Sequence, residues 1–89
     1  MLDVKEAAQR ASEYFAGLYA DEGVLNVQLE EVELTDDGQY WLITLSYPMI
    51  RSGEMSGIPI NLAFRRKYKV FKIDSRTGEV KSMKMRNIE

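Results

Sequence analysis

The stretch "FKIDSRTGEV", residues 71–80, carries a run of polar residues and one glycine between two apolar ends. Asp74 can accept hydrogen bonds from backbone amides that follow it, Thr77 can do the same more weakly, and Gly78 can adopt a positive φ angle. Residues of these types dominate tight turns for local reasons. The stretch therefore predicts a hairpin turn, not a catalytic or ligand site, and it makes the strands on either side of it antiparallel neighbours.

Another hairpin signal lies upstream of this turn. "TDDG" at 35–38 has Asp-Gly at its centre, and "QYWLITLSY" after it is the most strand-like segment of the chain. Before the turn, alternating apolar residues are put out of phase by "EE" at 30–31, which predicts a β-bulge. Consecutive hairpins predict a single antiparallel meander. We expect its strands at about 25–34, 39–47, 63–73 and 79–87.

An amphipathic helix is expected at 3–21, ahead of the first strand. Asp3 followed by Glu6 has the spacing of a capping box, and apolar residues recur after them at helical spacing. Gly23 is of the type that commonly ends a helix. A helix that precedes a meander packs across one face of the sheet. The expected fold class is therefore α+β, with one N-terminal helix packed on a four-stranded antiparallel meander sheet.

One domain is expected over 1–89, because a chain of 89 residues buries too little surface to support two cores. Within it, residues 48–62, "PMIRSGEMSGIPINL", interrupt the strand pattern with two prolines and two glycines. A connection of this length in a small domain is either functional or flexible, and the sequence leaves both interpretations open.

The last two strands and their turn resemble the PepSY domain. A strand that ends "Y-x-V-F-x-I-D", a turn "x-x-T-G-E-V" and an upstream helix with spaced alanines are similar to that family over about half the chain. The matching residues are Tyr68, Val70, Ile73, Asp74, Thr77, Gly78, Glu79 and Val80. The resemblance implies a helix-plus-meander module related in architecture to cystatin-like folds. PepSY-like domains occur mostly outside the cytoplasm, in protease propeptides and membrane-linked proteins, so it also implies inhibition or binding of a partner protein.

Composition excludes several classes of function. The chain has no cysteine and no histidine, which removes disulfides, thiolate chemistry, the commonest general base near neutral pH and the commonest transition-metal ligand. "MLDVKEAAQR" lacks a basic segment followed by an apolar one, and no apolar run approaches the roughly 20 residues of a membrane span. A cytoplasmic location is expected, with secretion the alternative if a signal peptide has been removed.

The net charge of −2 is unevenly distributed. Residues 1–63 carry three basic and eleven acidic side chains, a net charge of −8. Residues 64–89 carry nine basic and three acidic side chains, a net charge of +6. The two parts are expected to attract each other, within the fold or between copies of it.

No catalytic, cofactor or metal site is predicted. The acidic residues at 30–33 and 36–37 lack the ligand spacing of a calcium loop, and so does "DSRTGE" at 74–79. Catalytic carboxylates must converge in a pocket, whereas these residues are expected on exposed segments. We therefore expect a protein that is not an enzyme and that needs no cofactor.

A protein-interaction module is the function that the sequence favours. If Trp41 and Ile43 face the helix, strand alternation directs Tyr40 and Leu42 to the opposite face of the sheet. Contiguous apolar patches of this kind usually mark an interface, here with a partner protein or a second copy.

The third strand extends the predicted patch. If Phe64, Tyr68 and Val70 face the helix, Phe71 and Ile73 face away from it. A bulge near Val70 that returns Phe71 and Ile73 to the core is the alternative. The candidate partner-binding residues are Tyr40, Leu42, Phe71 and Ile73, together with Arg51 and Met55 of the 48–62 segment.

Nucleic-acid binding is an alternative, because "FRRKYKVFK" at 64–72 mixes basic and aromatic residues. Alternation separates the aromatic from most of the basic side chains, as in an ordinary half-buried strand, and the acidic first part would repel a polyanion. Nucleic acid is therefore not the favoured partner. A small ligand held between the helix and the sheet is a further hypothesis. The residues that would contact nucleic acid are Arg65, Arg66, Lys67 and Lys69.

Overall fold

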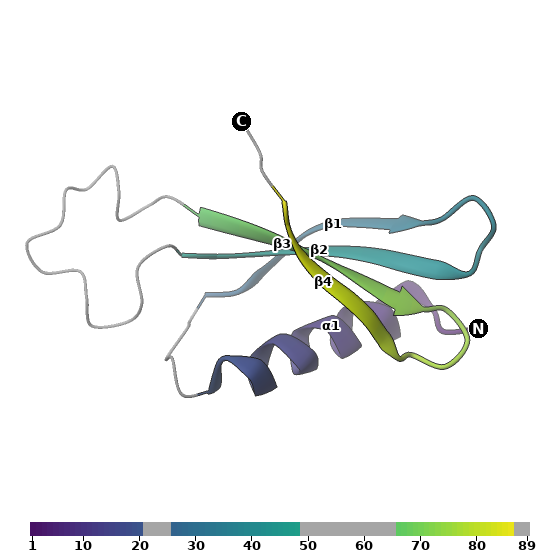
Figure 1. Ribbon diagram of the computed structural model, residues 1–89, viewed down its shortest axis with the longest axis horizontal. Helices are drawn as coiled ribbons and strands as arrows, with labels where there is room; N and C mark the ends of the chain where they lie inside the picture. Colours follow the sequence, from purple (N-terminus) through teal and green to yellow (C-terminus); the bar gives the residue numbers. More distant parts are fainter. Residues whose placement is uncertain (21–25, 49–65, 87–89) are drawn as a thin grey trace, which may run out of the picture.

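The computed structural model describes residues 1–20, 26–48 and 66–86, which form one helix and one sheet (Figure 1). The helix α1 spans Val4–Leu18, and the strands are β1 (Gln28–Leu34), β2 (Tyr40–Pro48), β3 (Arg66–Asp74) and β4 (Val80–Arg86). The strands pair antiparallel in the order β1-β2-β3-β4. The predicted α+β fold, one helix on a four-stranded antiparallel sheet, is confirmed. Residues 49–62 of the predicted long connection lie outside the described residues.

The helix begins at the predicted capping box. The Asp3 carboxylate accepts from the Glu6 amide at 2.8 Å, and the Glu6 carboxylate accepts from the Asp3 amide at 3.4 Å. At the other end, Tyr19 leaves helical geometry with φ −111° and ψ 21°, while its amide still donates to the Phe15 carbonyl at 3.0 Å. The helix therefore ends at Leu18, before the predicted end at residue 21.

The strand β1 contains the predicted bulge. Leu29 pairs with Leu45 and Glu31 pairs with Thr44, so Glu30 has no partner of its own in the ladder. The extra residue shifts the alternation between the two faces, because an inserted residue changes which face the following side chains occupy.

Both hairpin turns form where they were predicted. In the β1–β2 turn, the Thr35 amide donates to the Tyr40 carbonyl at 2.9 Å, and Gly38 has φ 70°. In the β3–β4 turn, the Gly78 amide donates to the Asp74 carbonyl at 2.9 Å, and Gly78 has φ 79°. A Cβ atom at Gly78 would also lie 3.1 Å from the Leu2 side chain, so this position requires glycine for conformation and for space.

The helix α1 covers one face of the sheet, and Figure 1 shows the other face of the sheet turned away from it. Ala7 and Ala11 bring the helix backbone close to the strands, and Phe15 packs edge-on against Phe71 with ring centroids 6.3 Å apart. Trp41 ties the N-terminus to the sheet through a 3.0 Å hydrogen bond to the Leu2 carbonyl. The buried core consists of Ala7, Ala11, Phe15, Ile43, Leu45, Phe71 and Ile73.

Phe71 and Ile73 are core residues with 0% exposure, so the prediction that they face away from the helix is wrong. The β2–β3 ladder runs without a register shift from Tyr40–Asp74 to Pro48–Arg66 and pairs Phe71 with the buried Ile43. No bulge in this ladder is needed to bury them. The error lies in the choice of inward residues, because Tyr68 and Val70 have the opposite parity and face away from the helix.

On β3, the helix-facing residue two positions before Phe71 is Lys69. Lys69 pairs with Leu45, and its ammonium lies 5.9 Å from the centroid of the Tyr19 ring, at the C-terminal end of α1. A long side chain can keep its charge near solvent at this position while its methylene groups cover apolar surface. This explains why a basic residue shares a face with the core.

Candidate functional site

The face of the sheet opposite α1, called the outer face below, carries a group of large side chains on its two central strands. Tyr40 and Leu42 of β2 lie on it as predicted, and so do Val70 and Tyr68 of β3, which pair with Thr44 and Ser46 further along the ladder. All four are half-buried. We call these four residues the outer cluster. Tyr68 and Val70 were missed as surface candidates because the parity of β3 was assigned the wrong way round.

Beside Val70 and Tyr68, the outer face of β2 carries two buried hydroxyl groups. Thr44 and Ser46 are 2% and 0% exposed, although α1 covers the opposite side of the sheet. Arg66 covers Ser46: its Nε donates to the Ser46 Oγ at 2.9 Å, and the hydroxyl donates to the Glu30 carboxylate at 2.6 Å. The bulge residue Glu30 thereby gains a partner on the neighbouring strand.

A matching arrangement covers Thr44. Arg86 of β4 donates to the Thr44 hydroxyl at 3.2 Å and forms an ion pair with Glu31 of β1. Its side chain thus reaches over the two central strands and connects the two edge strands of the sheet. Together the two arginines cover Thr44 and Ser46 and supply the hydrogen-bond partners that buried hydroxyl groups need.

Charged residues flank Leu42, Tyr40 and Val70 of the outer cluster. Lys72 lies beside Leu42 in the ladder, and its ammonium is 4.3 Å from the centroid of the Tyr40 ring, a cation–π contact. Glu33 pairs with Leu42 from β1, and Lys84 pairs with Val70 from β4. The outer cluster therefore lies between an acidic strand and a basic strand.

The basic residues proposed for nucleic-acid contact do not line one surface. Arg66 lies on the outer face, where Ser46 and the Asn26 carbonyl occupy its donors. Lys67 and Lys69 have the opposite parity and lie on the side of α1. Arg65 lies outside the described residues. Among the residues that the structure describes, the run therefore supplies no continuous basic stripe from these positions.

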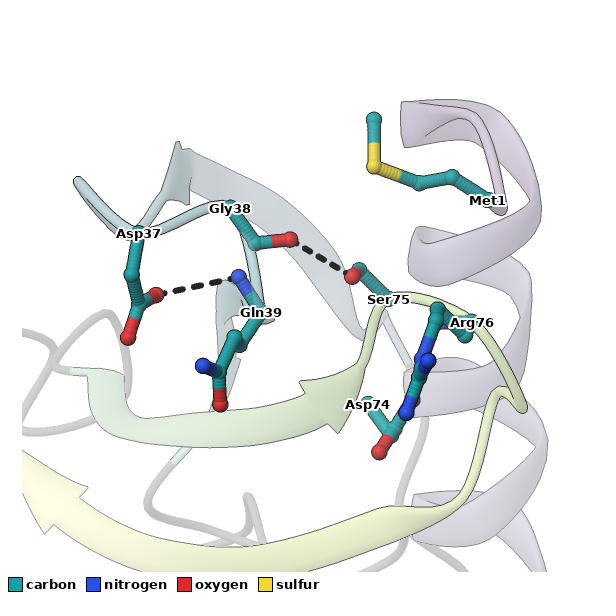
Figure 2. Close-up of a pocket in the computed structure, with 7 residues that line it drawn as sticks. All are labelled: Met1, Asp37, Gly38, Gln39, Asp74, Ser75 and Arg76. Atoms are coloured by element: carbon teal, nitrogen blue, oxygen red, sulfur yellow. Dashed lines mark hydrogen bonds between the residues drawn. The ribbon is translucent and has the colours of Figure 1, made fainter.

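A shallow depression lies at the end of the molecule where the two hairpin turns meet the N-terminus (Figure 2). Its volume is about 490 Å³. The Ser75 hydroxyl donates to the Gly38 carbonyl at 2.7 Å, and the Ser75 amide donates to the Gln39 carbonyl at 2.9 Å, so one turn is bonded to the other. The lining residues are Met1, Asp37, Gly38, Gln39, Asp74, Ser75 and Arg76.

The carboxylates of this depression are already used by the turns. Hydrogen bonds from the Thr77 and Arg76 amides lower the pKa of Asp74 below its ordinary value. The Gln39 amide and then the Thr35 hydroxyl lower the pKa of Asp37 in the same way. The hydrogen bonds that cause both shifts hold the turns in place, so residues 71–80 behave as a turn and not as an assembled acid–base pair.

Other site classes have no support in the part of the chain that the structure describes. Residues 1–20, 26–48 and 66–86 bring together no group of three or more potential metal ligands. The helix α1 is too short and too polar to cross a membrane. Arg51 and Met55, which were predicted to extend the binding surface, lie outside the described residues.

Comparison with protein-family models, with curated proteins and with solved structures returned no match.

Proposed function

We propose that this protein is a non-catalytic interaction module that binds a protein partner through the outer face of its sheet. The observation that carries the proposal is the outer cluster: Tyr40, Leu42, Tyr68 and Val70 are half-buried on the face that α1 leaves uncovered. Tyrosine is among the residues enriched in protein interfaces, because its ring gives a large contact area while its hydroxyl keeps a polar contact.

Two further features support this face over other parts of the surface. On the helix-facing side, Ile43, Leu45, Phe71 and Ile73 are packed in the core, although Leu29 and Met85 on that side are exposed. Among the described residues, the one helix lies on the side of the sheet opposite the outer cluster. Opposite charges on β1 and β4 frame the cluster, as in interfaces with an apolar centre and a polar rim. The PepSY-like motif points in the same direction, because members of that family are thought to bind partner proteins.

The alternatives have weaker support. A phosphate-binding stripe on β3 would need basic side chains on one face, but Arg66 and Lys67 face opposite sides. A ligand between helix and sheet would have to displace Ala7, Ala11 and Phe15, which fill that layer.

The experiment compares two identical substitutions on opposite sides of the sheet. Leu42→Glu places a charge in the outer cluster, and Leu18→Glu places the same charge on the exposed side chain of a helix residue. Each folded variant is immobilised, and the proteins retained from native lysate and from a solution of the untagged chain are quantified. Circular dichroism and urea unfolding establish that both variants fold.

We expect Leu42→Glu to lower the specifically retained protein at least about tenfold, which corresponds to a loss of about 1.4 kcal/mol or more at the centre of an interface. Leu18→Glu should retain as much as the wild type. Equal retention by the two variants would contradict the proposed function.

A further inference from the structure

The charges at the two edges of the outer face have opposite signs. Glu31 and Glu33 of β1 form an acidic stripe, and Lys84 and Arg86 of β4 form a basic stripe, with the outer cluster between them. Glu31 and Arg86 already pair with each other. Glu33 and Lys84 are exposed and form no ion pair with another described residue, so their charges are available to a partner on this face.

A second copy of the chain supplies the complementary pattern. When one sheet is rotated by half a turn about an axis parallel to the strands, between β2 and β3, its β1 lies over β4 of the first sheet. The acidic stripe of each copy then faces the basic stripe of the other, twice by symmetry. The strands of the two sheets stay roughly aligned, which is a usual arrangement for packed sheets.

We infer that the outer face binds the outer face of a second copy in this two-fold arrangement, with β2 of each copy over β3 of the other at the centre. The inference rests on the proposed function, because it names the partner of the same surface. A rotation about the perpendicular in-plane axis would place β1 over β1 and β4 over β4, and like charges would oppose each other. Charge therefore selects one of the two face-to-face symmetries.

Features of the edge strands β1 and β4 disfavour the pairing of two copies edge to edge. The bulge at Glu30 interrupts the ladder of β1, and Lys81 and Lys84 place charges along β4. Bulges and edge lysines are devices that block edge-to-edge strand addition. Joining β1 of one copy to β4 of the next would moreover give an open chain of copies and not a closed dimer.

The size of the face predicts a reversible dimer. Four strands spaced about 4.8 Å apart and about seven residues long cover roughly 450 Å² per copy. Two such faces fall near the lower limit of about 1,000 Å² for specific interfaces. The dimer should therefore depend on concentration, and it should weaken with salt because its rim contacts are exposed charges.

The test uses two charge reversals, Glu33→Lys and Lys84→Glu. In the proposed dimer Glu33 of one copy lies one ladder row away from Lys84 of the other. Each variant alone therefore brings like charges close together twice, and each should associate at least about tenfold more weakly than the wild type. An equimolar mixture restores both attractive contacts and should dimerise. Molar mass is measured by light scattering after size-exclusion chromatography, from about 10 µM to about 1 mM, the range suited to a small interface.

A matched pair of reversals controls for net charge. Glu13→Lys and Lys5→Glu change the total charge by the same amounts but lie on exposed positions of α1, away from the outer face. Each should dimerise like the wild type. Urea unfolding of all four variants shows that association is compared among folded proteins.

The inference is overturned if the wild type is monomeric throughout, if either outer-face reversal leaves the dimer intact, or if the mixture stays monomeric. These results are distinguishable from failure of the proposed function. Suppose that the wild type is monomeric and captures lysate proteins that the Leu42→Glu variant does not retain. That result rules out the second copy as partner and leaves the outer face as a binding surface. If Leu42→Glu changes neither retention nor molar mass, both the inference and the proposed function fail.

Discussion

The two faces of the same central strands are buried by different means. On the side of α1, Ile43, Phe71 and Ile73 lose their exposure by packing against helix residues. On the outer face, Thr44 and Ser46 lose theirs beneath Arg86 and Arg66, which satisfy the hydroxyl groups that they cover. Successive residues of β2 thus alternate between apolar packing and a polar network.

The difference shows that exposure alone does not assign a residue to a core. Ser46 and Ile43 are both 0% exposed, yet one belongs to the apolar layer and the other to a surface covered by charged side chains. The outer cluster extends from Tyr68 and Val70, beside these covered hydroxyl groups, to Leu42 and Tyr40 near the turns, on the side of the sheet opposite α1. This is the physical basis for treating it as a binding surface.

The largest effect is expected at two adjacent residues of β3 that lie on opposite faces of the sheet. Phe71→Ala should lower the free energy of unfolding by about 3–5 kcal/mol, because it leaves a cavity in the core beside Phe15. Val70→Ala, on the outer face, should cost less than about 1 kcal/mol. Urea unfolding at low protein concentration measures both. Similar losses for the two variants would mean that the faces are not distinct.

An intermediate effect is expected from the polar network. Arg66→Ala removes the donor to the buried Ser46 hydroxyl and should lower the free energy of unfolding by about 1.5–3 kcal/mol, the range for hydrogen bonds that involve a charged group. Lys67→Ala removes an exposed charge from the next residue and serves as the matched control. If the two variants lose equal stability in urea unfolding, Arg66 does not act through the network.

The smallest effect concerns the turns, which belong to neither face. Because hydrogen bonds hold the pKa of Asp74 and of Asp37 below the ordinary 3.8, both carboxylates stabilise the folded state above that pH. Their contribution is lost as the pH falls below about 4, through the lower folded pKa values. Asp74→Asn should flatten this part of the pH profile of the urea midpoint. An unchanged slope would show that the Asp74 turn does not contribute.

Local chemistry made much of this fold predictable. The capping box at Asp3 and Glu6, the bulge at Glu30 and the two glycine turns each depend on residues close together in the chain, and all of them form. The turn at Gly78 also illustrates the limit of such prediction. Its conformation follows from neighbouring residues, whereas its contact with Leu2 arises only from the packed N-terminus.

The face assignment of β3 could not be derived from its own pattern. Val70 and Phe71 are adjacent apolar residues, so either parity buries one of them, and the strand register against β2 decides which. The arginine network is also non-local, because Arg66 and Arg86 lie 20 and 42 residues from the hydroxyl groups that they cover. Its only signal in the sequence is the alternation of Thr44 and Ser46 with apolar residues.

A dilution series followed by methyl NMR tests whether the outer face binds while the helix-facing side holds the fold together. Leu42 and Ile43 are adjacent, and Val70 and Ile73 share a strand, so their methyl groups sample both faces under identical conditions. We expect the Leu42 and Val70 methyl shifts to change with concentration while those of Ile43 and Ile73 stay constant. Shifts that move equally on both faces, or only at Ile43 and Ile73, would contradict it.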